Sequence, residues 1–376
     1  MKTPTNNPKS YLQPEWEKEL RLSGGARRIS FRYNLLNRHD IPIGGIDGIT
    51  SASISYGEFR AIKRSAKFGL DEYARRHIDY LSDRIQPWFV LHMPGGGMVE
   101  WPLGIFLLES PVRAVSGGIS TRDIGAYDKT IIVEQDKFTH REFFPKGMNY
   151  AAAVTQILNT AGITKIEIAP TTQELPTARE YRIGTKKHLA INELLREINF
   201  ETLRIDEMGV ARSGPYVPPS DRKISHVYDT RKDSIVAPQI SESLDIANRP
   251  NVFKRVALNI EDDTELVAEF ENDDPASPIS TVNRGRRIVN YETINEIADQ
   301  ATLNEFVRRI AIESTTAYSH LTFGTALMPT HGDAETLLCF FPEISDVATK
   351  FHETGWEMPL VHDGEMRHTA RKVVRL

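Results

Sequence analysis

Histidines and serines are the side chains whose spacing most often reveals a metal-binding or catalytic site. The chain has 376 residues and 11 histidines, and none forms His-Glu-x-x-His, the pattern that puts two zinc ligands on one helix face. We therefore interpret His77, His92 and His140 as surface or strand-face residues. The serines lack the Gly-x-Ser-x-Gly turn that exposes a nucleophile. These patterns predict neither a zinc site nor a catalytic serine.

The single cysteine, Cys339, lies in the apolar run 337–341. One cysteine excludes a disulfide within the chain and also a cysteine-rich zinc site. Because an apolar environment keeps a thiol protonated, we interpret Cys339 as a small buried residue rather than a nucleophile.

Carboxylates gather in one stretch, 261–274, without a base between them. The stretch lacks the Asp-x-Asp-x-Asp-Gly order of a calcium loop, so a solvated hairpin face explains it better. A negative surface that repels DNA is a third interpretation. A glycosidase pair depends on a tertiary distance of about 5–10 Å, so the sequence leaves that alternative open. The acids are Glu261, Asp262, Asp263, Glu265, Glu269, Glu271, Asp273 and Asp274.

Glycine clusters offer no nucleotide site. The run 95–97 is not followed by Gly-Lys-Ser/Thr, and apolar strand-like segments flank it on both sides. Gly44, Gly45 and Gly48 lack the spacing and the following helix of a dinucleotide-binding loop. We interpret both clusters as turns. The sequence therefore predicts no cofactor, and we assign no catalytic, cofactor-binding or metal-binding residue.

Composition narrows the class of protein. The 46 basic and 51 acidic residues give a net charge of −5, which argues against a protein that coats nucleic acid. Hydrophobic residues are 40% and charged residues 26%, typical of globular chains, and the length predicts two or three domains. No apolar run reaches the ~20 residues of a membrane span, and the polar start is not a secretory signal. We expect a soluble protein made in the cytosol.

Most elements are predicted to be strands. Apolar and polar residues alternate over 29–35, 52–56 and 66–70, the period of a half-buried strand. The segments 88–91 and 105–108 flank the glycine run and predict a hairpin. Strands at this spacing without long helices favour an antiparallel sandwich or barrel, a mainly β (α+β) fold. Residues 1–28 read as an arm, for which mobility is favoured slightly over anchoring by Trp16, Leu20 and Leu22.

In the middle of the chain, the spacing of apolar residues changes from that of strands to that of helices. Val154, Ile157, Leu158 and Ala161 share one helix face, and Gly162 stands at the position of a C-terminal cap. The segment 191–198 repeats this spacing. Each helix is preceded by a short strand-like segment and a glycine, at 141–147 and again at 179–184. We interpret this as a weak two-fold repeat in a small α/β insertion. Strands then resume, interrupted by one helix that begins near Thr302.

The order of these segments resembles the tail hub (baseplate hub, tail-associated protein) of long-tailed bacteriophages and prophages. The resemblance runs from about residue 29 to 376 and rests on sequence order more than on any single piece. Its landmarks are 88–89, 98–106, 127–128, 136–138, 185–199, 248–251, 280–286 and 356–360.

The resemblance implies two tail-tube-like antiparallel β-barrels. The first would comprise 29–128 plus 214–235 and contain a small α/β (LysM-like) insertion at 129–213. The second would comprise 236–292 plus 321–376 and contain a helical insertion at 293–320; 1–28 would be an N-terminal arm. The expected state is a homotrimer, which would adapt a six-fold tail tube to three-fold tip proteins.

The same resemblance implies binding partners and a location in the virion. The partners would be the distal tail protein, the tape-measure protein and a tail fibre or needle/spike protein, in a virion tail tip assembled in the host cytoplasm. DNA would pass without specific binding, which a negative channel surface favours. The basic residues Arg367, Arg371, Lys372 and Arg375 would pair with neighbours, and Trp88, Trp101 and Trp356 are interpreted as core rather than interface.

Two alternatives remain beside the structural role. Hub chains often continue into a cell-wall hydrolase, whereas this sequence stops after the second expected barrel, so we expect such an activity on a separate chain. LysM-like units bind glycan in other proteins, and 129–213 would then make the protein a peptidoglycan-binding module. A baseplate hydrolase is the third class, and we expect no such activity because no catalytic pattern supports it.

Overall fold

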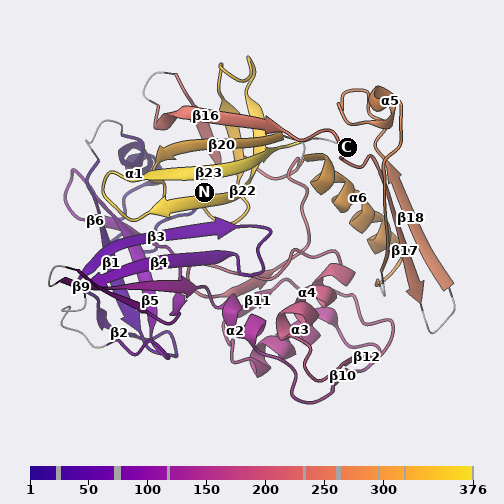
Figure 1. Ribbon diagram of the computed structural model, residues 1–376, viewed down its shortest axis with the longest axis horizontal. Coiled ribbons are helices and arrows are strands. Elements are labelled where there is room, and N and C mark those ends of the chain that lie inside the picture. Colours follow the sequence, from indigo (N-terminus) through magenta and orange to yellow (C-terminus); the bar gives the residue numbers. More distant parts are fainter. Residues whose placement is uncertain are drawn as a thin grey trace.

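The computed structural model describes residues 1–22, 27–71, 78–116, 119–231, 234–259, 264–294, 297–316 and 319–374. Within them, strands far outnumber helices and most strand pairs are antiparallel. The expected mainly β fold is therefore confirmed. Figure 1 shows a large sheet, a helical unit below it and a narrow sheet with one long helix at its side. None of the helices in the described residues combines the length and apolar character that a membrane crossing needs.

One large sheet joins the two ends of the chain. Its N-terminal and C-terminal halves meet where Trp356 lies opposite Tyr56, and the two rings stack 6.0 Å apart. The antiparallel path runs through β16 (Val236–Leu244), β20 (Ser319–Ala326), β23 (Glu365–Lys372), β22 (Thr349–Pro359), β3 (Ile49–Gly57), β4 (Arg64–Asp71), β9 (Ile119–Tyr127), β7 (Phe106–Leu108), β5 (Arg84–His92), β1 (Ile29–Leu36) and β2 (Pro42–Gly45).

Four more strands extend the large sheet, two in each half. The predicted hairpin is confirmed: β5 pairs with β6 (Met98–Pro102) around the glycine run, where Gly96 and Gly97 have positive φ. Strand β8 (Val112–Ser116) pairs with β9. Strand β15 (His226–Asp229) pairs in parallel with β21 (Thr336–Phe340), which pairs with β22. The segment 214–235, which we had expected in the first barrel, therefore contributes its strand to the C-terminal half.

The insertion confirms the two-fold repeat. It contains β10 (Glu142–Phe144), a turn at Gly147 and α3 (Tyr150–Thr160), and then β12 (Arg179–Tyr181), a turn at Gly184 and α4 (Lys187–Glu197). The two strands pair antiparallel and the two helices pack together. Both glycines have φ near +80 to +90°, a conformation that a Cβ makes costly. Short elements α2 (Thr130–Gln135), β11 (Ile166–Ile168), β13 (Arg204–Ile205) and β14 (Ala211–Ser213) complete the unit.

The insertion also has a separate core. Its buried cluster runs from Val133 to Ala211 and includes Tyr150, Leu158 and Leu194, all fully buried. Because α3 and α4 each turn one apolar stripe towards the other, they cover the short strands without help from the large sheet.

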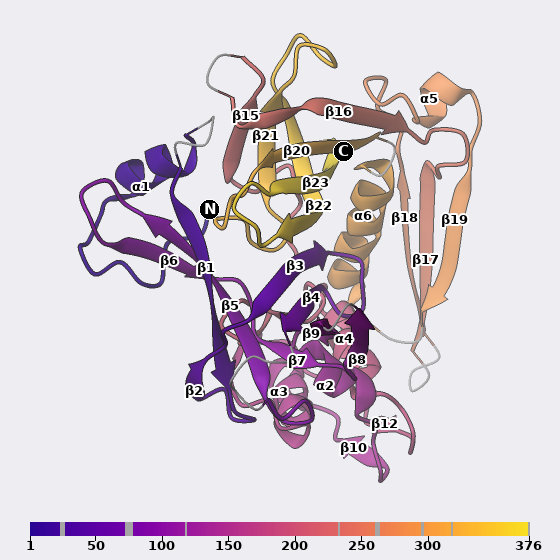
Figure 2. The ribbon, with the colours of Figure 1, turned by 60° about the vertical axis from the view of Figure 1, so that its left-hand side comes forward.

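A second separate unit differs from our expectation. We had placed 236–292 in the second barrel, but β17 (Val252–Asn259), β18 (Thr264–Glu271) and β19 (Val289–Ile294) form their own three-stranded sheet. The long helix α6 (Gln300–Thr316) packs on one face of this sheet, as Figures 1 and 2 show, and a short helix α5 (Thr281–Arg284) lies near its end. Alternation explains the arrangement, because Phe253, Ala257 and Ala268 share the face that α6 covers.

The N-terminal arm is anchored to its own chain. Helix α1 (Gln13–Leu20) buries Trp16 and Leu20 in the core of the first half, and the Trp16 ring meets Trp101 edge-on at 5.5 Å. Lys2 donates its backbone N–H to Thr330, and Asn6 forms a bridge with Glu100. The described part of the arm thus touches both halves of the large sheet. Apolar burial outweighs the chain entropy that favours mobile termini.

Candidate functional site

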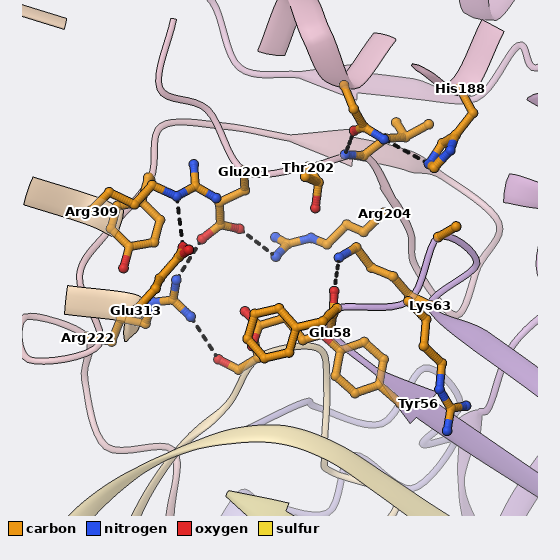
Figure 3. A pocket seen from close by; sticks show the side chains of 17 residues that line it. Tyr56, Glu58, Lys63, His188, Glu201, Thr202, Arg204, Arg222, Arg309 and Glu313 are labelled. Atoms are coloured by element: carbon orange, nitrogen blue, oxygen red, sulfur yellow. Dashed lines mark hydrogen bonds and ion pairs between the residues drawn. The ribbon is translucent and has the colours of Figure 1, made fainter. Parts of the chain in front are cut away.

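A cavity of about 410 Å³ lies where the large sheet, the insertion and α6 meet. We call it the junction cavity; Figure 3 shows its lining. The large sheet contributes the turn after β3, with Glu58 and Lys63, and α4 contributes His188. The lining is Tyr56, Glu58, Phe59, Arg60, Ala61, Lys63, His188, Asn192, Glu201, Thr202, Leu203, Arg204, Tyr216, Arg222, Arg309, Glu313 and Ala334.

Backbone hydrogen bonds hold the cavity walls in place. The turn after β3 is closed by the Gly57 N–H, which donates to the Lys63 carbonyl, and is tied to β22 by the Glu58 N–H. On α4, the Asn192 side chain accepts the Leu203 N–H at 2.9 Å. That bond fixes the segment 201–204, whose residues all line the cavity, against the helix.

Each carboxylate of the cavity already has a cationic or imidazole partner. Glu58 Oε2 lies 2.7 Å from Nε2 of His352, a residue that does not line the cavity. Glu201 accepts hydrogen bonds from Arg222 at 2.8 Å and Arg204 at 3.1 Å. The remaining pair joins Arg309 and Glu313 at 2.8 Å. The acids are therefore engaged.

Lys63 is a buried cation of the cavity without a carboxylate partner in the described part of the chain. Its side chain is 7% exposed, and its ammonium group donates to the backbone carbonyl of Glu58. Burial lowers the pKa of Lys63, and Arg204 lowers it further, while Glu58, Asp333 and Glu201 raise it. Lys63 and Arg204 both line the cavity, and Figure 3 shows the Arg204 guanidinium directed to Glu201 and the Lys63 ammonium directed to Glu58.

An aromatic wall closes the other side. The Arg309 guanidinium lies 4.3 Å from the centre of the Tyr216 ring, a cation–π contact. The Tyr216 hydroxyl is buried and has no hydrogen-bond partner within the described residues. Burial raises the pKa of Tyr216, with the nearby Glu313 charge as the second cause. The phenol therefore stays protonated and can donate to a ligand.

A second cluster, which we call the histidine–glutamate cluster, is buried between β15, β22 and β23. Glu353 Oε2 lies 2.7 Å from His331 Nδ1, and Oε1 lies 2.6 Å from His368 Nδ1. The other ring nitrogens are also engaged: Tyr228 Oη lies 2.6 Å from His331 Nε2, and Thr325 Oγ1 lies 2.8 Å from His368 Nε2. Both histidines and Glu353 are fully buried side chains.

Hydrogen bonds account for this cluster better than a metal ion. The ligand atoms of His331, Glu353 and His368 lie within 4.8 Å of one another. Two ligands around a tetrahedral zinc ion with bonds near 2.0 Å are separated by roughly 3.3 Å. The observed 2.6 and 2.7 Å separations are those of N–H···O bonds to a carboxylate. We therefore interpret the cluster as a buried hydrogen-bond network.

His226 extends the cluster by stacking. Its ring lies 3.9 Å from the His331 ring and nearly parallel to it. Both of its nitrogens are buried, and neither has a hydrogen-bond partner in the part of the chain that the structure describes. Burial and then the neighbouring His331 lower the pKa of His226 well below 6.5. Burial and the neighbouring His368 do the same for the pKa of His331. Both rings are neutral at pH 7.

The residues singled out from the sequence lie elsewhere. His92 is on β5 beside Ser30, His140 is exposed, and His77 lies outside the described residues. Cys339 is 2% exposed, and burial raises its pKa, so its interpretation as an unreactive core residue is confirmed. Trp88, Trp101 and Trp356 are likewise buried in this chain, at 8%, 1% and 5% exposure.

The acidic stretch is only partly described. Residues 261–263 lie outside the described part, and Glu269 pairs with Lys254 at 3.2 Å and with Arg287 at 2.9 Å. Glu271 lies 3.5 Å from Arg287. These ion pairs offset part of the negative charge that we had assigned to a DNA-repelling surface.

Sequence spacing missed the histidine–glutamate cluster because its members are spread from 226 to 368. One local signal exists: His368 lies between Met366 and Ala370, on the buried face of β23. A polar residue among the apolar residues of a strand's buried face indicates a buried hydrogen-bond partner. The partner itself can be identified only from the tertiary fold.

Solved structures share this fold, although no known family model and no curated protein sequence matches the chain. A tail protein from Neisseria meningitidis MC58 has a TM-score of 0.65 at 11% identity, with 91% of this chain and 96% of that chain covered. The 43 kDa tail protein of prophage MuSo2 from Shewanella oneidensis has a TM-score of 0.61 at 12% identity, covering 92% and 98%. Prophage tail protein gp18 from Listeria monocytogenes EGD-e has a TM-score of 0.55 at 10% identity, covering 90% and 94%.

At these identities the likeness shows the fold. It extends over nearly the whole of each chain and is not confined to one part of it. The resemblance to phage tail hub proteins is thereby confirmed at the level of the fold.

Proposed function

We propose that this protein is a structural component of a phage or prophage tail, and that it acts through its shape rather than by catalysis. The observation that carries this proposal is the near-complete overlap with two tail proteins of similar length. One feature agrees with it: burial lowers the pKa of His226 and of His331, so these two histidines are neutral core groups.

We further propose that three copies form a hub at the tail tip. The path of the large sheet ends in β16 and β2, so each end offers backbone groups that can pair with another chain. Strand β16 is mostly exposed along its length, including Leu244 at 61%. A three-fold ring of chains, each with two halves of one sheet, would supply six similar units to a six-fold tube.

The partners proposed for this hub are the distal tail protein above, the end of the tape-measure protein inside and a fibre or needle/spike protein below. DNA would pass through the ring without specific contacts. The net charge of −5 supports a non-adhesive channel. The described acids of 264–274 support it less than we expected, because two of them are ion-paired.

Electron microscopy of intact particles tests the hub. The expected result is a three-fold ring of this chain at the tail tip, located by a gold-labelled antibody and by fitting the fold to the density. Particles whose tip lacks this chain, or carry it in six-fold rings along the tube, would contradict the proposal.

A cell-wall binding module is the second candidate function. The observation that favours it is the insertion's own core together with apolar side chains left on its surface, Phe143 at 61% and Leu189 at 59% exposure. Sedimentation of the full chain with purified peptidoglycan tests it, and Phe143→Ser with Leu189→Ser should abolish co-sedimentation. No binding by the unaltered chain, or binding unaffected by these changes, would leave the hub as the sole role.

A further inference from the structure

The junction cavity holds more positive than negative charge. Its lining contains Arg60, Lys63, Arg204, Arg222 and Arg309 against three glutamates. One of the three, Glu58, is directed to His352 and not to a cation of the lining. Glu201 is shared between two arginines, and Glu313 serves a third. Arg60 donates to the hydroxyl of Ser55 and Lys63 to a backbone carbonyl, so both lack a counterion in the described part of the chain.

The excess of cationic side chains is unusual because one of them, Lys63, is buried. A lysine that is 93% buried normally has a carboxylate partner, because removing an unpaired ammonium from water is costly. Three nearby acids, Glu58, Asp333 and Glu201, raise the pKa of Lys63 and Arg204 lowers it. None of these acids forms an ion pair with Lys63 in the described part of the chain, where its ammonium donates to a backbone carbonyl. The nearby acid Asp333 does not relieve the shortage, since it is paired with Arg64 at 2.5 Å. Two clustered cations in a concave site are the arrangement that proteins use to hold an oxyanion.

Neutral donors complete the arrangement. The Tyr216 hydroxyl is buried without a hydrogen-bond partner among the described residues, and Thr202 also lines the cavity. A phosphate or carboxylate group accepts several hydrogen bonds at once, so it can use a guanidinium, an ammonium and hydroxyls together. The cavity volume of about 410 Å³ leaves room for more than the oxyanion group itself.

We propose that the junction cavity binds a small oxyanion ligand, with its phosphate or carboxylate group between Lys63 and Arg204. Binding joins three parts of the fold: Lys63 belongs to the turn between β3 and β4, Arg204 to the insertion and Arg309 to α6. A bound anion therefore fixes the insertion and the α6 unit against the large sheet. This site goes beyond the structural role proposed above and does not depend on it.

Calorimetry and thermal unfolding of the full chain test the site with defined probes. Pyrophosphate represents a phosphate source and citrate a carboxylate source, each compared with sodium chloride of equal ionic strength. We expect saturable binding of at least one probe and a midpoint of unfolding that rises with its concentration, because the probe binds the folded state. The stronger probe identifies the source.

Variants locate the binding. Lys63→Met keeps the length of the buried side chain without its charge and should weaken binding at least tenfold, as should Arg204→Gln on the opposite wall. The matched control is Lys67→Met, an exposed lysine on β4 outside the cavity lining, which should bind as the unaltered chain does. If Lys63→Met fails to fold, Arg204→Gln decides the question. Equal binding by all variants, or no saturable binding of either probe to the unaltered chain, would overturn the proposal.

Discussion

Glu353 is a buried carboxylate whose two oxygens each accept a hydrogen bond from a histidine ring. The Tyr228 hydroxyl donates to His331 from the other side, which leaves the proton of that ring on Nδ1, facing Glu353. Burial raises the pKa of Tyr228 well above its usual value, so its proton is retained. The two oxygens of Glu353 are thus held by hydrogen bonds to both rings, and each group of this hydrogen-bond network depends on the next.

Replacing Glu353 tests this dependence. Glu353→Gln puts an amide NH₂ where one histidine N–H needs an acceptor, so a buried donor loses its partner. We expect a loss of about 1–3 kcal/mol in the free energy of unfolding, measured by urea denaturation. Glu357→Gln is the matched control, because Glu357 is exposed on the same strand and should change stability by less than about 0.5 kcal/mol. A similar loss in both variants would contradict a special role for the cluster.

The neutral histidines predict a pH dependence. His226 and His331 have folded-state pKa values well below 6.5, whereas in the unfolded chain they titrate near 6.5. Below pH 6.5 the unfolded state therefore binds more protons, and stability falls as the pH falls, by up to about 1.4 kcal/mol per pH unit for each group. Above pH 6.5 this contribution is complete.

His226→Phe isolates one of these groups. A phenyl ring can keep the stacking on His331 while removing two buried nitrogens that have no partner. We expect the variant to be as stable as the unaltered chain at pH 7.5 and more stable at pH 5.5, by about 1 kcal/mol or more. Urea denaturation at the two pH values measures this. An unchanged difference between the two pH values would show that His226 is not protonated on unfolding.

Among the elements, the arm gains its order from a few apolar side chains. Helix α1 has eight residues and is too short to be stable alone. Its apolar residues Trp16 and Leu20 fall four apart, so they share one face and enter the same core. The sequence contained this spacing, but only the tertiary structure shows that Trp101 lies opposite.

Trp16→Ala should release the arm. Trp16 is 2% exposed and contacts Trp101, so its truncation should cost about 3–5 kcal/mol and make 1–22 sensitive to trypsin. Leu12→Ala is the control in the same arm, because Leu12 is 68% exposed and should change stability by less than about 0.5 kcal/mol. Equal protease sensitivity of the two variants would mean that the arm is not held by Trp16.

In the whole molecule, the large sheet is built from both ends of the chain, and the pairing of β3 with β22 joins its two halves. The insertion and the α6 unit have separate cores and project from it. The two halves of the sheet therefore form one continuous framework, whose exposed ends at β16 and β2 remain for contacts between chains.

The proposed trimer predicts a mass in solution. Native mass spectrometry should give three times the 42.5 kDa of one chain, and Leu244→Lys on β16 should shift the population towards single chains, since it places a charge on a packed edge. Val361→Lys is the control at a similarly exposed apolar residue away from β16. A monomer at all concentrations would contradict assembly by this chain alone, and an unaltered trimer in Leu244→Lys would exclude β16 as its interface.

The sequence by itself determined the class of several local elements. Period-two alternation identified β1, β3 and β4, and glycines before helical stripes identified the repeat of the insertion, because these patterns depend only on neighbours along the chain. What only the tertiary structure decided is which strands pair and which distant side chains meet. The separate β17–β18–β19 sheet, the anchoring of α1, the junction cavity and the histidine–glutamate cluster all depend on contacts between segments far apart in sequence. Local periodicity carries no record of such partners, because register and packing are settled by burial of the whole chain at once.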